Sequence, residues 1–137
     1  MKNLVVYLMF DGACEAAMNF YRDALKGEIV SLMRMGDSEM PVADEFKNYI
    51  MHSVLQAGSI CLMASDTMPQ HPIVFGNNAH LSLDFDNADE QTAVFEHLAG
   101  GGNVTMPLQD TFWGARFGTL TDQFGVCWMF NYDYPKA

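Results

Sequence analysis

Apolar residues along the chain recur with two periods, one typical of strands and one typical of amphipathic helices. Residues 3–10 and 79–86 are rich in Val, Leu, Phe and Tyr, which predicts a strand at each place. Asp11 and Asp86 follow these strands at once, and we expect them to be helix N-caps, because a carboxylate accepts hydrogen bonds from the free N–H groups of a first helical turn. The pattern therefore predicts the same strand-to-helix step twice.

Helical spacing continues after both aspartates. The predicted buried face of the first helix consists of Ala13, Ala17, Phe20, Tyr21 and Ala24. The predicted buried face of the second consists of Ala88, Thr92, Phe95 and Ala99. We expect the first helix to end at Gly27 and the second at the glycine run 100–102, because glycine takes the left-handed conformation of a helix terminus without strain.

Three shorter strands are predicted after each helix. They lie near 28–35, 49–57 and 59–65, and then near 103–109, 115–121 and 126–131. A polar loop, residues 36–47, follows the first of them, and it is interpreted either as a solvated loop or as a mobile lid.

The two halves are copies of one another. When residues 3–30 are placed over residues 78–105 without gaps, nine of the 28 positions are identical. The last strands match at an offset of 66, with identical residues at Cys61 and Cys127 and at Met63 and Met129. A repeat of this kind indicates the architecture directly.

The repeat predicts an α+β fold made of two β-α-β-β-β modules. We place the modules at about residues 1–66 and 78–134, with a linker near 67–77, all within a single domain spanning 1–137. The strands are expected to form a curved mixed sheet around a cavity, with the helices outside.

Strand alternation separates a helix-facing side from a side that the helices leave free. In the strand at 79–86 the helix-facing residues are apolar, and His80, Ser82 and Asp84 lie on the other side. Tyr7 in the first strand, and Met63 and Met129 in the last strand of each module, share that side. A few polar groups in a methionine-rich lining are typical of a small-molecule pocket, although such residues also fill a cleft or a dimer contact.

Two further residues are candidates for ligand binding. Trp113 precedes the seventh strand, where it forms an aromatic wall of the pocket or anchors a core or dimer contact. Arg116 either binds a ligand carboxylate or phosphonate or forms a structural ion pair. His52 lies mid-strand with its facing unsettled, and a structural histidine is the default interpretation.

Charge and cysteine usage limit the partners and the compartment. The formal net charge of −10 repels nucleic acid and anionic membranes, and no apolar stretch reaches the length of a membrane span. Three widely spaced cysteines without a CxxC pair favour a reducing cytoplasm over a disulfide framework.

Several short motifs resemble those of one family. They are Tyr7-Leu8, Phe20-Tyr21, Gly58-Ser59, Met63-Ala64-Ser65-Asp66, Thr111-Phe112-Trp113-Gly114, the segment Thr121-Asp122-Gln123-Phe124-Gly125-Val126, and Trp128-Met129. On these residues the chain resembles the PhnB-like branch of the vicinal oxygen chelate superfamily, which includes glyoxalases, bleomycin-resistance proteins and dioxygenases. The resemblance covers nearly the whole chain and implies paired β-α-β-β-β modules and a homodimer.

In catalytic members of that superfamily, the resemblance further implies a divalent metal. It is bound by a His or Gln on the first strand and a Glu on the last strand of each module. Here those positions hold Val5, His80, Met63 and Met129, so His80 is the one matching ligand. We therefore expect no metal or other cofactor, with a divalent metal held by substituted ligands as the alternative.

Two functions follow as hypotheses. The first is a binding protein that holds a small organic molecule in a cavity lined by Met and aromatic residues. The second is a metal-dependent lyase, isomerase or dioxygenase with substituted ligands, suggested by His80 and Asp84 on one strand face. Members of the branch often carry a methyltransferase label, but the sequence has no glycine-rich turn for an adenosyl cofactor.

Overall fold

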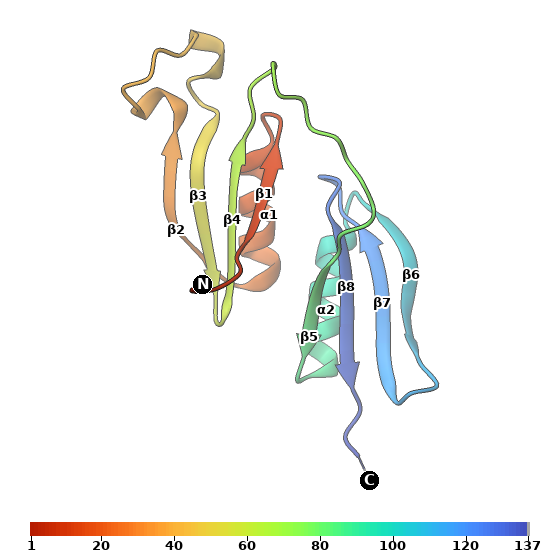
Figure 1. Ribbon diagram of the computed structural model, residues 1–137. Helices are drawn as coiled ribbons and strands as arrows, with labels where there is room; N and C mark the ends of the chain where they lie inside the picture. The colour runs from red at the N-terminus through yellow and green to blue at the C-terminus, as the bar shows by residue number, and fades with distance from the viewer. Residues whose placement is uncertain (137) are drawn as a thin grey trace. The chain divides into compact units, whose positions relative to one another are not determined.

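The computed structural model describes residues 1–136 and consists of two compact units, which divide between Val74 and Phe75. This division falls inside the segment 67–77 that the sequence indicates as a linker. Each unit contains four strands and one helix in the order β-α-β-β-β, which confirms the predicted α+β class (Figure 1).

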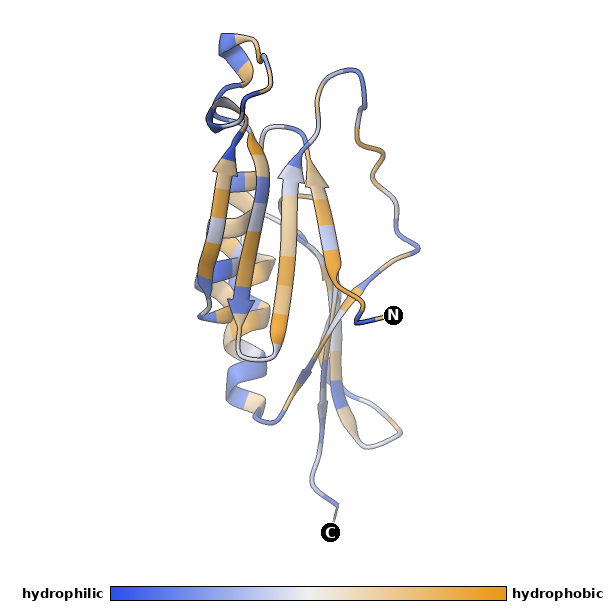
Figure 2. Cartoon of the chain, turned by 60° about the vertical axis from the view of Figure 1, so that its left-hand side comes forward, coloured by the Kyte–Doolittle hydropathy of each residue, from blue (hydrophilic) through white to orange (hydrophobic). Residues whose placement is uncertain are grey.

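The first unit is a four-stranded sheet with one helix packed on it. Its elements are β1 (Val6–Phe10), α1 (Cys14–Leu25), β2 (Glu28–Arg34), β3 (Ile50–Ala57) and β4 (Ile60–Asp66). The strand order is β1-β4-β3-β2, with β1 parallel to β4 and the other neighbours antiparallel. Figure 2 shows α1 lying against one face of this sheet, with hydrophobic and hydrophilic residues mixed along the strands.

The second unit repeats this arrangement. Its elements are β5 (Leu81–Phe85), α2 (Ala88–Ala99), β6 (Asn103–Asp110), β7 (Ala115–Thr121) and β8 (Cys127–Asp133). The strand order is β5-β8-β7-β6, and β5 is parallel to β8. Strands pair only within their own module in the part of the chain that the structure describes, so the eight strands form two sheets where the sequence predicted one curved sheet.

Strand pairing reproduces the sequence repeat independently. Tyr7 pairs with Met63 in the first sheet, and Ser82 pairs with Met129 in the second. Ser82 is 75 residues after Tyr7, and Met129 is 66 residues after Met63, which are the two offsets of the repeat. The matched residues therefore occupy equivalent places in the two sheets.

Repeated glycines are explained by a close approach rather than by a helix end. A Cβ added at Gly27 would lie 2.6 Å from the backbone oxygen of Gln56, and one added at Gly102 would lie 2.5 Å from that of Thr121. In α1 the residue that takes the left-handed conformation is Lys26, with φ of 55°, so the prediction that Gly27 performs this role was wrong. Glycine is needed at Gly27 because the neighbouring strand leaves no room for a side chain.

The predicted helix caps were also wrong. The N-cap of α1 is Ala13, which makes no side-chain cap bond, and the N-cap of α2 is Asn87, whose side chain accepts from Glu90 N at 2.9 Å. At α1 the aspartate that binds the free N–H groups is Asp66 of β4, and its Oδ1 accepts from the backbone N–H of Gly12 (2.9 Å) and Cys14 (3.0 Å). A residue distant in sequence thus performs the capping role predicted for Asp11.

The helices bury faces slightly different from those expected. The buried residues of α1 are Cys14, Ala17, Met18, Tyr21 and Ala24. The buried residues of α2 are Gln91, Val94, Phe95 and Leu98. In α2 the difference arises because Gln91 is buried with its polar atoms satisfied: its Nε2 donates to the backbone oxygen of Arg116 at 2.9 Å.

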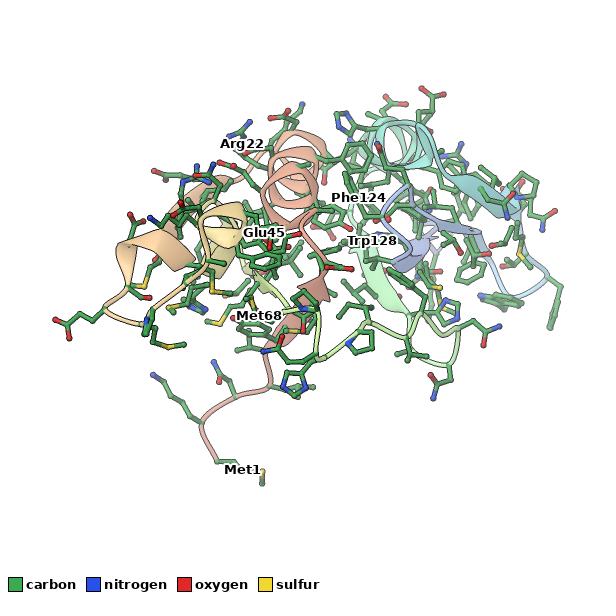
Figure 3. The ribbon with its side chains drawn as sticks, turned by 90° about the horizontal axis from the view of Figure 1, so that it is seen from above. Met1, Arg22, Glu45, Met68, Phe124 and Trp128 are labelled. Atoms are coloured by element: carbon green, nitrogen blue, oxygen red, sulfur yellow. The ribbon has the colours of Figure 1, made fainter. Side chains whose placement is uncertain are left out.

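A buried tryptophan organises the core of the second unit. Trp128 of β8, labelled in Figure 3, is 1% exposed, and its indole N–H donates to Asp122 Oδ2 at 2.8 Å. The other carboxylate oxygen of Asp122 accepts from the backbone N–H groups of Phe124 and Val126 in the β7–β8 turn. The segment 121–126, one of the motifs that carried the family resemblance, is therefore a hydrogen-bonded turn that also binds the core tryptophan.

The loop at 36–47 is partly ordered by short helical turns. Single 3₁₀ turns cover Met35–Asp37 and Asp44–Phe46, and the backbone N–H of Gly36 donates to Lys47 O at 2.9 Å. None of the helices among residues 1–136 is long and apolar enough to cross a membrane.

Candidate functional site

The face of the first sheet opposite α1 carries two rows of side chains, which we name the first open face. One row contains Tyr7, Met63, Val54 and Ser31, each paired with the next across β1, β4, β3 and β2. The other contains Met9 paired with Ser65, and His52 paired with Met33. Figure 3 shows several sulfur atoms of the first unit on the side of its sheet away from α1.

Tyr7 and His52 form a hydrogen-bonded pair on the first open face. The Tyr7 hydroxyl oxygen lies 3.0 Å from His52 Nδ1, and the two rings are stacked with centroids 5.7 Å apart and planes 21° apart. Because β4 lies between β1 and β3, this pair bridges across the middle strand. His52, whose facing the sequence left unsettled, thus joins Tyr7, which the sequence predicted.

The two rows of the first open face are rich in methionine and accessible, and the carboxylate of Glu28, paired with Gln56, lies at the edge of the same side of the sheet. Tyr7, Met9 and Met33 are 44%, 43% and 46% exposed, although each stands on a strand. Ser65 is buried beside Met9, and its hydroxyl donates to the Met9 sulfur at 3.3 Å. Tyr7 and Met9 are neighbours on β1, and Met33 lies across the sheet on β2 beside His52. Contiguous exposed apolar surface of this kind marks interaction sites.

The helix-free face of the second sheet, the second open face, contains three of the predicted residues. Ser82 pairs with Met129 and Asp84 pairs with Asn131 between β5 and β8. The Asn131 side-chain nitrogen donates to Asp84 Oδ1 at 3.0 Å and to Asp133 Oδ1 at 3.2 Å. Two carboxylates, those of Asp84 and Asp133, thus share one amide partner on this face.

His80 lies outside the strand that was predicted to carry it. Strand β5 begins at Leu81, and His80 is exposed just before it, with Nε2 2.9 Å from the backbone oxygen of Asn77. Likewise, β1 begins at Val6 and not at residue 3, because its parallel pairing with β4 starts at Val6 and Leu62.

Trp113 lies in the turn between β6 and β7, among other aromatic rings. It is 60% exposed and makes edge contacts with Phe112 and with Phe117, at centroid distances of 4.9 and 6.5 Å. Phe112 is 97% exposed. The turn thus presents two large aromatic side chains to solvent in the structure of this chain.

Arg116 faces the helix and not the open face. Its Nη1 donates to Ala88 O at 3.2 Å, Gln91 Oε1 at 3.2 Å and Thr92 Oγ1 at 2.8 Å, all on α2. The sequence predicted that Arg116 either binds a ligand or forms a structural ion pair. The observed contacts to α2 are structural, but they are hydrogen bonds to uncharged groups and not an ion pair.

The structure thus places the predicted residues in two separate sets. Tyr7 and Met63 lie together on the first open face, and Ser82, Asp84 and Met129 lie together on the second. The alternation of the first strand places Met9 beside Tyr7 on this face, whereas sequence reasoning missed His52 and Met33 as members of the first set.

These architectures and motifs match a known family. The sequence profile of the Glyoxalase/Bleomycin resistance protein/Dioxygenase superfamily matches residues 3–130. The chain belongs to this superfamily. Its paired β-α-β-β-β modules are the fold that the sequence resemblance implied.

Individual relatives support the PhnB-like branch. Protein YjdN from Escherichia coli strain K12 is 31% identical over 135 residues, which cover 91% of each chain. The crystal structure of protein PA1353 from Pseudomonas aeruginosa is 43% identical with a TM-score of 0.89, covering 97% of this chain and 98% of that one. The PhnB protein from Bacillus cereus, described as a putative 3-demethylubiquinone-9 3-methyltransferase, is 30% identical with a TM-score of 0.81, covering 96% and 99%.

The residues present do not fit the metal of the catalytic superfamily members. Of the four positions, Val5 offers no donor atom, and Met63 and Met129 offer thioethers, which are poor ligands for hard or borderline divalent cations. His80 alone offers an imidazole. Among residues 1–136, no group of three or more His, Cys, Asp or Glu side chains could hold a metal ion.

Proposed function

We propose that this PhnB-like protein binds a small organic molecule through the Met and aromatic residues of its open faces, without the metal site of its catalytic relatives. The observation that carries this proposal is the first open face, where Tyr7, Met9 and Met33 are nearly half exposed around the Tyr7–His52 hydrogen bond. An apolar surface with one polar pair is the composition that small-molecule sites use.

The apolar part of this surface is large enough to bind a ligand. Burying one Met or Tyr side chain from water contributes about 1.5–3 kcal/mol. Since less than half of each of three such side chains is exposed on the first open face, a molecule covering them gains about 2–4 kcal/mol, which is the scale of millimolar binding, before any hydrogen bond is counted. Methionine is also adaptable in shape, which suits ligands of varied outline.

A metal-dependent lyase, isomerase or dioxygenase is the competing function. It is tested by elemental analysis of protein purified without chelator. The proposal expects no stoichiometric metal, and it expects a melting temperature that does not change when Zn, Ni, Mn or Fe is added. Near-stoichiometric metal in the wild type that is lost in His80→Ala would instead support the competing enzyme.

We further infer that the protein acts as a homodimer in a reducing cytoplasm. The exposed Phe112 and Trp113 support an interface, because such large aromatic side chains are seldom left in water. The three cysteines are all free thiols, which supports a reducing compartment. Light scattering of the wild type and of Trp113→Ala tests the interface, and a monomeric wild type would contradict it.

A further inference from the structure

The Tyr7–His52 pair is the polar centre of the first open face. Its two members come from β1 and β3, on either side of β4, and they meet at 3.0 Å between the phenol oxygen and Nδ1. Tyr7 is 44% exposed and His52 is half-buried. The pair is therefore reachable from solvent and is held in one place by two strands of the same sheet.

Either tautomer of His52 leaves hydrogen-bonding capacity for a ligand. If the Tyr7 hydroxyl donates to Nδ1, then the imidazole proton is on Nε2, and this N–H group is a donor directed away from the pair. If Nδ1 carries the proton and donates to the phenol oxygen, then Nε2 is an acceptor and the Tyr7 hydroxyl proton is free to be donated. A ligand hydroxyl, which is both donor and acceptor, complements both forms, whereas a methyl group complements neither.

The surroundings of the pair favour an aromatic, uncharged ligand. The thioethers of Met9, Met33 and Met63 belong to the same face, and sulfur makes favourable contacts with aromatic rings. The two rows that make up the first open face contain no Asp, Glu, Lys or Arg, and Glu28 lies at the edge of the same side of the sheet, paired with Gln56 on β3. An ionised ligand lying on the two rows would lose hydration without gaining an opposite charge there, and an anion would also be repelled by Glu28.

From this geometry we propose that the Tyr7–His52 pair is the polar anchor of the binding site and selects neutral aromatic molecules that carry a hydroxyl group. This inference rests on the proposed function and adds the class of ligand and the two residues that recognise it. The aromatic ring lies over the methionines, and the hydroxyl group bonds to the phenol–imidazole pair.

The test compares two probes that differ in one group. Dissociation constants of 2-naphthol and 2-methylnaphthalene, in which methyl replaces hydroxyl, are measured by calorimetry on metal-stripped protein. The preference for 2-naphthol is the ratio of the two dissociation constants. It should be about 3- to 10-fold lower in Tyr7→Phe than in the wild type, which is the effect of losing one hydrogen bond. His52→Phe should lower it equally, and the double variant should lower it no further, because the two residues act as a unit.

Tyr49→Phe is the matched control. Its hydroxyl also belongs to the first unit, but it lies beside Gly12 at the β1–α1 turn, so the preference should be unchanged. An equal preference in wild type and Tyr7→Phe would overturn the role of the pair while leaving the proposed function intact. A wild type that binds neither probe would contradict both.

A second measurement does not depend on the variants. In the wild type, the imidazole nitrogen signals of His52 should shift when 2-naphthol is added and should stay in place with 2-methylnaphthalene. Equal shifts with both probes, or none with 2-naphthol, would overturn the proposed anchor.

Discussion

Asp66 is the residue whose removal should damage the first unit most specifically. Its carboxylate is 4% exposed and accepts three backbone N–H groups: Gly12 (2.9 Å) and Cys14 (3.0 Å) on Oδ1, and Ile50 (2.8 Å) on Oδ2. It therefore joins the end of β4 to the start of α1 and the start of β3. Substitution by alanine leaves all three donors without this acceptor.

The magnitude follows from the bonds lost. A hydrogen bond to a charged group contributes about 1.5–3 kcal/mol, and such losses are not fully additive, so Asp66→Ala should cost about 3–5 kcal/mol. Asp66→Asn retains one carbonyl oxygen, which can serve Gly12 and Cys14 but then turns an NH₂ group toward Ile50 N–H. It should cost about 1.5–3 kcal/mol, which is the loss of one such bond.

The assay is urea unfolding followed by far-ultraviolet circular dichroism, with the midpoint and slope compared between variants. Asp11→Ala is the matched control, because Asp11 is an exposed carboxylate in the same turn whose predicted capping role the structure gives to Asp66. It should stay within about 0.5 kcal/mol of the wild type. The reasoning is refuted if Asp66→Ala costs less than about 1 kcal/mol or if Asp11→Ala costs as much as Asp66→Ala.

Three further predictions concern single side chains. The hydrogen bond from Arg34 lowers the pKa of Glu15 below 4.5, so the pair stabilises the fold above that pH, and this stabilisation is lost as pH falls through the folded pKa. Arg34→Met should therefore lower the unfolding midpoint at neutral pH, and the midpoints of the variant and the wild type should converge in acid. Burial raises the pKa of the Cys14 thiol from 9.0 to about 12, so the free energy of unfolding should decline as pH rises from 9 toward 12. A thiol reagent should modify Cys61 before Cys14, and Cys14 should react only on unfolding. Arg116→Met removes three hydrogen bonds to α2 and should destabilise the protein by about 1–3 kcal/mol in denaturation assays, whereas an unchanged stability with weakened ligand binding would favour the ligand role.

The repeat could be predicted from sequence because strand and helix periods are local and occur twice. Each predicted strand lies within a few residues of its observed bounds, and the predicted and observed bounds of β7 are identical. The errors at strand starts arose where no partner exists: Leu4 is 97% exposed because pairing of β1 with β4 begins at Val6. Pairing partners depend on tertiary structure, which local periodicity does not contain.

Capping and helix faces failed for the same physical reason. The acceptor for the first turn of α1 is Asp66, more than fifty residues away, so a search for a nearby aspartate chose Asp11 instead. Gln91 was left out of the buried face of α2 because a polar side chain is buried only when partners satisfy it, and its partner is the backbone of Arg116 on β7.

Half of the Tyr7–His52 pair was predictable. The alternation of β1 placed Tyr7 opposite the helix, but β3 has mixed polarity on both faces, with Ser53 buried and Val54 on the first open face. The buried Ser53 is tolerated because its hydroxyl donates to Ala64 O at 2.8 Å. Because this contact between β3 and β4 is tertiary, the sequence alone gives no basis for deciding which side of the sheet His52 faces.

The central claim, that the first open face binds an aromatic small molecule without a metal, is tested most directly by methionine-methyl NMR of metal-stripped protein titrated with 2-naphthol. The methyl signals of Met9, Met33 and Met63 should shift in a saturable manner, while that of Met18, a fully buried residue of α1, should stay in place. The account is contradicted if those three signals do not move, or if they move only after a divalent metal is added.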